Sequence, residues 1–247
     1  MCWSGVGFQP LEKKSLGASV FEQICDHIVD GTLRPGERLP AERALADELG
    51  VNRQAVREGL NRLEQVGLVQ TRMGGGTKVL DFRRTAGLEL LAKMIVTRNG
   101  IDTAMVRSVL EMRETMGEAV VRLCARRRGS GVVDRLRATL SQLREAMGDV
   151  PAQQRLALSF WHEVVDGSGN LAYRLAFNSL QAAYGQVLEQ TERRMADEVS
   201  AVDDYARVVD AIDRGDEDAA AAATRDIVGR GARAVADVLD ALDEAGR

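Results

Sequence analysis

Apolar residues recur every three to four positions through the first third of the chain, which is the spacing of helices. The stretch 18–31 carries one such face and predicts a helix that ends at its final glycine. After a turn-rich connector, a short helix is expected over 41–49 and a third over 52–66, with Asn52 as its N-cap. The inward faces of these helices are expected to be formed by Val20, Phe21, Ile24, Cys25, Ile28, Val29, Leu45, Ala46, Leu49, Ala55, Val56, Leu60 and Leu63.

Two short β-prone runs, 68–72 and 77–80, flank three consecutive glycines and predict a hairpin. Three helices followed by a hairpin are the plan of a winged helix-turn-helix, in which the hairpin is the wing. A glycine-rich phosphate loop is the alternative, but that motif needs Lys followed by Ser or Thr at the start of a helix. Here the glycines lead into a β-prone run, so we favour the winged domain and place it over 1–82.

From about residue 84 the pattern is helical to the end, with Gly, Asp and Asn breaks between most segments. The segments expected to be helical are 84–97, 102–127, 131–147, 152–167, 171–197, 200–213 and 217–244. The predicted fold is therefore mainly α, with an N-terminal winged helix-turn-helix followed by a C-terminal all-α helical bundle of six or seven helices over 83–247.

The composition indicates a protein with an aliphatic core, reduced cysteines and no membrane span. Of 247 residues, 45% are hydrophobic and only 4% aromatic, so Leu, Val, Ala and Met must fill the core. The three cysteines are scattered and form no Cys-x-x-Cys pair, which fits reduced thiols in the cytosol. The first residues lack the apolar region of a secretory signal, and the run 88–96 is interrupted by Lys93, so no membrane span is expected.

The exposed face of the third helix carries residues suited to nucleic acid. Arg53, Gln54 and Arg57 lie on its N-terminal, outward side, and Arg57 follows Arg53 by one turn. Arg suits guanine or phosphate, Gln can read adenine, and a helix N-terminus attracts phosphate. Glycines at the wing tip would let backbone amides approach a phosphate or enter a minor groove. These features predict a surface for double-stranded DNA, whereas Arg62 and Glu64 are assigned to the solvated face.

The net charge of the chain means that a basic DNA-binding surface can only be local. The chain has a formal net charge of −4, and residues 1–80 hold ten Lys or Arg and ten Asp or Glu. No global basic field exists, so the acidic side chains of this half are expected to lie away from the DNA-binding face.

The stretch GTLRPGERLPAERALADELGVNRQAVREGLNRLEQVGLVQTRMGGGTKV, residues 31–79, resembles the DNA-binding domain of the GntR family of bacterial transcription regulators. The later segments DFRRTAGLELL, VLEMRE and SGNLAYRLAFNSLQAAYG resemble the FadR subfamily, whose effector domain is of the FCD type. The resemblance is closer to the actinobacterial repressors of mammalian-cell-entry (lipid-import) operons. It implies a cytosolic, homodimeric transcription regulator, expected to be a repressor, that binds a palindromic operator and responds to a small-molecule effector.

The DNA contacts of the family can be carried over position by position. The resemblance implies DNA contacts at Arg43, Arg53, Gln54, Arg57, Gly74, Gly75 and Thr77. Two positions depart from the pattern. Met73 stands where FadR has a histidine that reaches into the minor groove, and Ala41 replaces the more usual serine cap of the second helix.

Many members of the subfamily bind a divalent metal in the helical domain through one Asp and three His. The corresponding positions here are Ala157, Trp161, Tyr205 and Ile227, none of which is an ordinary metal ligand. His162 is one residue out of register and points about 100° away on its helix. We therefore expect neither a metal nor another cofactor.

FadR itself binds a fatty acyl-CoA without metal, and Arg113 matches a pocket arginine there. Gly117, one turn later, offers no acid. Arg113 therefore either pairs with an acid on another helix or lines a pocket for a carboxylate or phosphate. Asn178 and Tyr205 are further candidates for pocket polar groups. The effector implied is a small acid, by resemblance a fatty acid or acyl-CoA, although segment 224–235 does not reproduce the acyl-CoA grip of FadR.

An enzyme is the competing interpretation, with the helical bundle as the catalytic part and the winged domain as an interaction module. The sequence offers no recognisable nucleophile motif, no metal cluster and no paired carboxylates with an assignable role. We therefore expect a regulator without catalytic residues.

Overall fold

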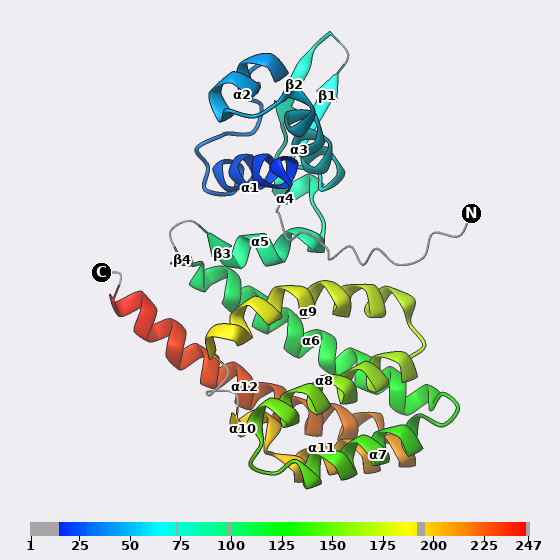
Figure 1. The fold of residues 1–247 in the computed structure, drawn as a ribbon. Coiled ribbons are helices and arrows are strands. Elements are labelled where there is room, and N and C mark those ends of the chain that lie inside the picture. Colours follow the sequence, from blue (N-terminus) through cyan, green and yellow to red (C-terminus); the bar gives the residue numbers. More distant parts are fainter. Residues whose placement is uncertain (1–14, 73, 98–99, 192–195, 246–247) are drawn as a thin grey trace, which may run out of the picture. The chain divides into compact units, whose positions relative to one another are not determined.

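The structure is a computed structural model, and it divides the chain into two compact units, Met1–Leu90 and Leu91–Arg247 (Figure 1). The sequence placed the boundary at 82, and the units instead divide after two short helical turns that follow the wing. The residues described are 15–72, 74–97, 100–191 and 196–245.

The described residues of the N-terminal unit form three helices, a hairpin and two helical turns, in the order of a winged helix-turn-helix. They are α1 (Leu16–Val29), α2 (Glu42–Leu49), α3 (Arg53–Gln65), β1 (Val69–Arg72), β2 (Gly76–Val79), α4 (Phe82–Thr85) and the 3-10 turn η1 (Leu88–Leu90). Asn52 caps α3 as predicted, because its Oδ1 accepts from the backbone N of Ala55 at 2.8 Å. At the start of α2, Ala41 provides no side-chain cap.

The apolar faces of α1 and α3 pack closely, with Val20 and Val56 buried between them. A Cβ at Gly59 of α3 would lie 2.6 Å from Cγ1 of Val20, so this close approach requires glycine inside the helix. Most of the predicted inward residues are buried. Those that are only partly buried are Phe21, Val29 and Leu49.

The base of the wing is hydrogen-bonded to the connector between α1 and α2, a contact that the sequence did not predict. β1 and β2 pair antiparallel, with Val69 opposite Val79. The connector between α1 and α2 runs beside β2: the backbone N of Leu39 donates to the carbonyl of Thr77 at 2.9 Å, and Val79 donates to Glu37 at 2.8 Å. The hairpin is therefore tied to the residues that lead into α2.

The C-terminal unit is a helical bundle with one two-stranded ladder. Its elements are α5 (Leu91–Ile95), β3 (Val96–Thr97), β4 (Gly100–Ile101), α6 (Thr103–Arg127), α7 (Val132–Glu145), α8 (Val150–Gly167), α9 (Leu171–Thr191), α10 (Ala196–Val199), α11 (Val202–Arg214) and α12 (Glu217–Ala245). Helix α6 is central, since it contacts α5, α8, α9, α11 and α12 (Figure 1).

The predicted helix over 84–97 is wrong in extent. The segment 84–97 is broken at Ala86, whose backbone is extended, and its end forms β3, where the β-branched Val96 and Thr97 favour strand over helix. Within the predicted helix 171–197, the structure describes α9 up to Thr191 and α10 from Ala196, while residues 192–195 lie outside the described residues.

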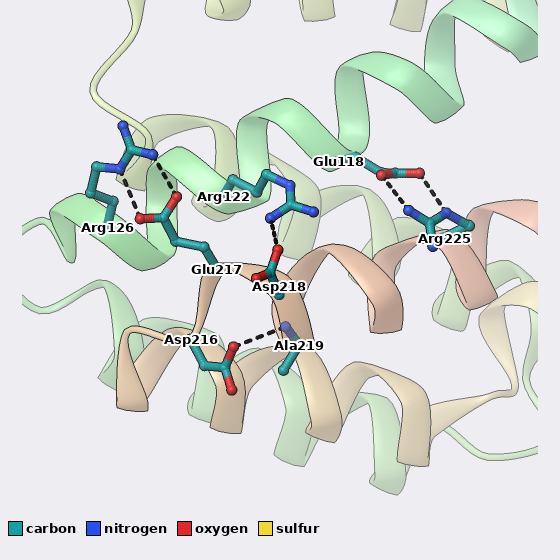
Figure 2. A network of polar contacts seen from close by, with 8 residues as sticks. All are labelled: Glu118, Arg122, Arg126, Asp216, Glu217, Asp218, Ala219 and Arg225. Carbon is teal, nitrogen blue, oxygen red and sulfur yellow. Dashed lines mark hydrogen bonds and ion pairs between the residues drawn. The ribbon is translucent and has the colours of Figure 1, made fainter.

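Ion pairs join the outer faces of α6 and α12 in register (Figure 2). Arg126 binds Glu217 through Nε at 2.8 Å and Nη2 at 2.6 Å, and Arg225 binds Glu118 at 2.7 and 2.6 Å. The hydrogen bonds from the arginines lower the pKa of both glutamates. Such exposed pairs stabilise a fold only slightly, so their main consequence here is the alignment of the two helices.

Candidate nucleic-acid interface and effector region

The first turns of α3 present three polar side chains to solvent. Arg53, Gln54 and Arg57 are all exposed, with 65% of the Arg53 side chain and 61% of the Arg57 side chain accessible. The opposite face of the helix is buried, because Val56 and Leu63 lie in the core. The predicted DNA-facing side of α3 is thus free of the packing that holds the helix in place.

One acidic side chain lies on this same face, contrary to the prediction that the acids would lie away from it. Glu42, the first residue of α2, accepts hydrogen bonds from Arg57 Nη2 at 2.9 Å and Arg57 Nε at 3.4 Å. Its Oε2 also lies 3.8 Å from Nη2 of Arg53. The hydrogen bond from Arg57 lowers the pKa of the Glu42 carboxyl. Arg43, the next residue of α2, is exposed.

The wing tip combines glycines of positive φ with open space. Gly74 and Gly76 have φ of 74° and 73°, which an L side chain rarely adopts, yet no atom lies within 4 Å of a Cβ built at either position. At Gly75, a Cβ would lie 3.2 Å from the Cβ of Arg72. Met73, which replaces the histidine of FadR, lies outside the described residues.

Thr77 does not belong to the exposed tip. Its side chain is buried, and its Oγ1 lies 3.2 Å from Oγ1 of Thr71 on the paired strand. The resemblance implied a DNA contact there, but the hydroxyl is used to join β1 to β2. The physical reason is the period of two along a strand, which turns this position inward between the exposed Gly76 and Lys78.

In the helical unit, Arg113 is paired with an acid on another helix. Its Nη1 lies 3.2 Å from Oε2 of Glu198 on α10, and its Nη2 also contacts Oε1 of that residue. Only 19% of the arginine side chain and 4% of the glutamate side chain are accessible. Of the two alternatives left open by the sequence, pairing to a distant acid is therefore realised in the structure.

The other two candidate pocket residues lie in different surroundings. Tyr205 is fully buried, with its ring 5.0 Å from the ring of Phe160 and 6.2 Å from that of Trp161. Asn178, by contrast, is exposed on α9. The structure does not enclose these two residues in one site.

The comparisons with known proteins agree with this architecture. Residues 16–79 match the family described as bacterial regulatory proteins, gntR family, and residues 108–230 match the FCD domain. The HTH-type transcriptional regulator Mce2R of Mycobacterium tuberculosis is 39% identical over 223 residues, which cover 90% of this chain and 92% of that protein. The chain belongs to the GntR family. It is a DNA-binding transcription regulator and not an enzyme, as its sequence predicted.

Further relatives of this GntR protein support the same class and fold. The fatty acid metabolism regulator protein of Erwinia tasmaniensis is 30% identical over 166 residues, covering 67% of this chain and 68% of that protein. The solved structure of Lar, which controls the expression of the Listeria monocytogenes agr system, matches with a TM-score of 0.57 at 16% identity, over 91% of this chain and 98% of that one. The mainly α fold with a winged helix-turn-helix and an FCD domain is thereby confirmed.

The residues at the metal-ligand positions of the subfamily do not fit a metal in this GntR protein. Ala157, Tyr205 and Ile227 are buried in the hydrophobic core, and Trp161 packs against it. Among the described residues, no group of three or more His, Cys, Asp or Glu could hold a metal ion. His162 is engaged elsewhere, with its Nδ1 at 2.8 Å from Nη1 of Arg174.

No helix within the described part of the chain is long and apolar enough to cross a membrane. Cys124 is a buried residue of α6, and burial raises the pKa of its thiol to about 12, so this cysteine stays protonated and unreactive at neutral pH.

Sequence reasoning missed Glu42 and Glu198, the two acids that bind candidate arginines. Glu42 is 15 residues from Arg57, and Glu198 is 85 residues from Arg113. A signal existed for Glu42, because a helix-turn-helix brings the start of its second helix beside the third. None existed for Glu198, since its approach depends on how the whole bundle packs.

Proposed function

We propose that this GntR regulator acts in the cytoplasm as a homodimeric repressor that reads a short palindromic operator. The observation that carries the proposal is the group of exposed polar side chains at the start of α3, in the unit that also carries the open tip of the wing. The residues assigned to DNA contact are Arg43, Arg53, Gln54, Arg57, Gly74 and Gly75. Thr77 is left out because its side chain holds the hairpin together.

The DNA assignment is tested on the fragment that lies upstream of the protein's own gene. Arg53→Ala and Arg57→Ala should each weaken binding about tenfold or more if the arginine reads a base. Neither should alter the melting temperature, because both side chains are exposed and outside the core. Arg62→Ala removes an exposed arginine from the same helix and is the matched control, with little expected effect. Unchanged affinity in both test variants would refute the assignment.

The effector is proposed to be a small acid of lipid origin that binds the FCD domain. Similarity to regulators of fatty acid metabolism supports the chemical class. The guanidinium of Arg113, four-fifths enclosed, supports an anion as the charged part of the ligand. An effector carboxylate or phosphate would compete with Glu198 for this cation. Tyr205 remains a pocket candidate, whereas the exposed Asn178 would meet an effector only at the surface.

Oleate and oleoyl-CoA should raise the melting temperature by binding the folded state, and should release the upstream DNA fragment. Lactate and gluconate serve as small-acid comparators. Arg113→Lys should weaken both responses to the lipids, since it keeps the charge but loses the planar fork. Alanine is avoided because it would leave the buried Glu198 carboxylate unpaired.

Arg122→Lys is the matched control on α6, because that arginine pairs with the exposed Asp218. If lactate or gluconate released DNA and the lipids did not, the lipid assignment would be overturned while the DNA-binding function stood. If Arg122→Lys weakened the lipid responses as much as Arg113→Lys, the assignment of Arg113 would be wrong.

A further inference from the structure

The guanidinium of Arg57 has two edges, and Glu42 occupies only one of them. Nε and Nη2 of Arg57 face the two carboxylate oxygens of Glu42 at 3.4 and 2.9 Å. The outer edge, formed by Nη1 and the second proton of Nη2, holds no contact with any residue that the structure describes. An arginine edge of this kind can donate two parallel hydrogen bonds to O6 and N7 of guanine.

Arg53 has no comparable restraint, although it lies beside the same carboxylate. Its Nη2 is 3.8 Å from Oε2 of Glu42, which is an ion pair but longer than a hydrogen bond. The orientation of its guanidinium is therefore not fixed. Glu42 therefore fixes the orientation of the Arg57 guanidinium by hydrogen bonds, whereas the guanidinium of Arg53 can still change its orientation.

We propose that Glu42 is a positioning residue that makes Arg57 the guanine-reading side chain of α3. This inference rests on the proposed readout of DNA by that helix. Holding the inner edge of Arg57 limits the rotamers from which it could bind a phosphate and leaves the outer edge for a base. The negative charge of Glu42 repels phosphates of any sequence, whereas the orientation of Arg57 favours only sites that offer guanine. Glu42 therefore lowers affinity for DNA in general and raises discrimination between sequences.

The experiment uses the full chain and a duplex that the wild-type protein selects from a random pool of synthetic duplexes. Affinity is measured by fluorescence anisotropy for this duplex and for a scrambled duplex of the same base composition. Glu42→Gln should reduce the ratio of the two affinities about tenfold, with binding to the scrambled duplex unchanged or tighter. Asp47→Asn removes the same charge from an exposed position on α2 and should leave the ratio unchanged.

A second readout separates positioning from a general structural effect. Each guanine of the selected duplex is replaced in turn by 7-deazaguanine, which lacks the N7 acceptor. At one position the replacement should weaken the wild-type protein about tenfold and leave Glu42→Gln almost unaffected. Glu42→Gln should also add no further loss of discrimination to Arg57→Ala, because the glutamate is proposed to act only through that arginine.

Three results would overturn the inference. The affinity ratio could be unchanged in Glu42→Gln, or it could fall equally in Asp47→Asn. It could also rise in Glu42→Gln, which would mean that Glu42 competes with DNA for Arg57. Suppose that the wild-type protein prefers the selected duplex and that Arg57→Ala loses that preference. If Glu42→Gln then keeps the wild-type affinity ratio, only the inference about Glu42 is wrong, and the proposed DNA readout by α3 stands. If the wild-type protein selects no sequence at all, the proposed operator readout and this inference both fall.

Discussion

Two arginine–glutamate pairs, one in each unit, both make two contacts between a guanidinium and a carboxylate but differ in their exposure. Arg57 with Glu42, and Arg113 with Glu198, each use two nitrogens of the arginine against two oxygens of an acid on a different helix. In the first pair 61% and 31% of the side chains are accessible, and in the second only 19% and 4%.

This difference determines what each pair can do. An exposed pair forms and breaks at little cost in free energy, because water replaces either partner, so it can orient a side chain that must also meet DNA. In the buried pair each charge depends on the other, because removing one leaves an uncompensated charge in the interior. A ligand can take Arg113 from Glu198 only if it brings an anion of its own.

The largest expected effect is the loss of Glu198. Glu198→Gln removes a buried carboxylate from Arg113 and should lower the free energy of unfolding by about 3 kcal/mol. Urea denaturation, followed by circular dichroism and by tryptophan fluorescence, to which Trp161 of the second unit contributes, measures the change. Glu42→Gln is the matched variant, and it should leave the denaturation midpoint nearly unchanged. Equal losses of stability in the two variants would show that the different exposure of the two pairs does not determine how much each contributes to stability.

A smaller effect is expected when the buried pair is replaced as a whole. Arg113→Met combined with Glu198→Leu leaves no unpaired charge, so the double variant should recover most of the stability lost in Glu198→Gln, to within about 1 kcal/mol of the wild-type protein. The same urea titration measures it. Stability as low as in the single variant would indicate that the pair supports the packing of α10 rather than only its own charges. The double variant should also lose the response to oleate, if Arg113 binds the effector.

The elements of the N-terminal unit, which carry the exposed pair, were largely predictable from the sequence. The three helices and the hairpin of the N-terminal unit follow from local patterns: the apolar spacing, the Asn52 cap and the glycines at the wing. Exposure of Arg57 follows from the same pattern, because it lies about 100° from the buried Val56 around the helix, whereas Arg53 is exposed at the first position of α3.

The partners of the arginines were not predictable by the same means. Local periodicity predicts side-chain pairs at spacings of three or four residues on one helix. Glu42 reaches Arg57 across the turn between α2 and α3, and Glu198 lies on α10, between the helices that were expected over 171–197 and 200–213. Thr77 is a further example of a contact that the sequence did not predict. The family resemblance implied that it contacts DNA, and the pairing of β1 with β2 shows that its side chain turns inward.

The smallest expected effect concerns the charge state of the exposed pair. The hydrogen bond from Arg57 lowers the pKa of Glu42 below its ordinary value of 4.5. A depressed carboxyl pKa contributes stability that is fully present above the ordinary value and is lost as the pH falls through the lowered one. The pair should therefore persist slightly below pH 4.5 and break in stronger acid, with little change in overall stability because both groups are exposed.

Carbon-13 NMR of the Glu42 carboxyl during a pH titration measures this directly. In Arg57→Ala the midpoint should rise toward the ordinary glutamate value, because the largest cause of the depression is removed. In Arg53→Ala it should rise less, since Arg53 is 3.8 Å away and donates no hydrogen bond to Glu42. If the two variants shifted the midpoint equally, the two arginines would interact alike with Glu42, and the distinction between an oriented and an adaptable arginine on α3 would be lost.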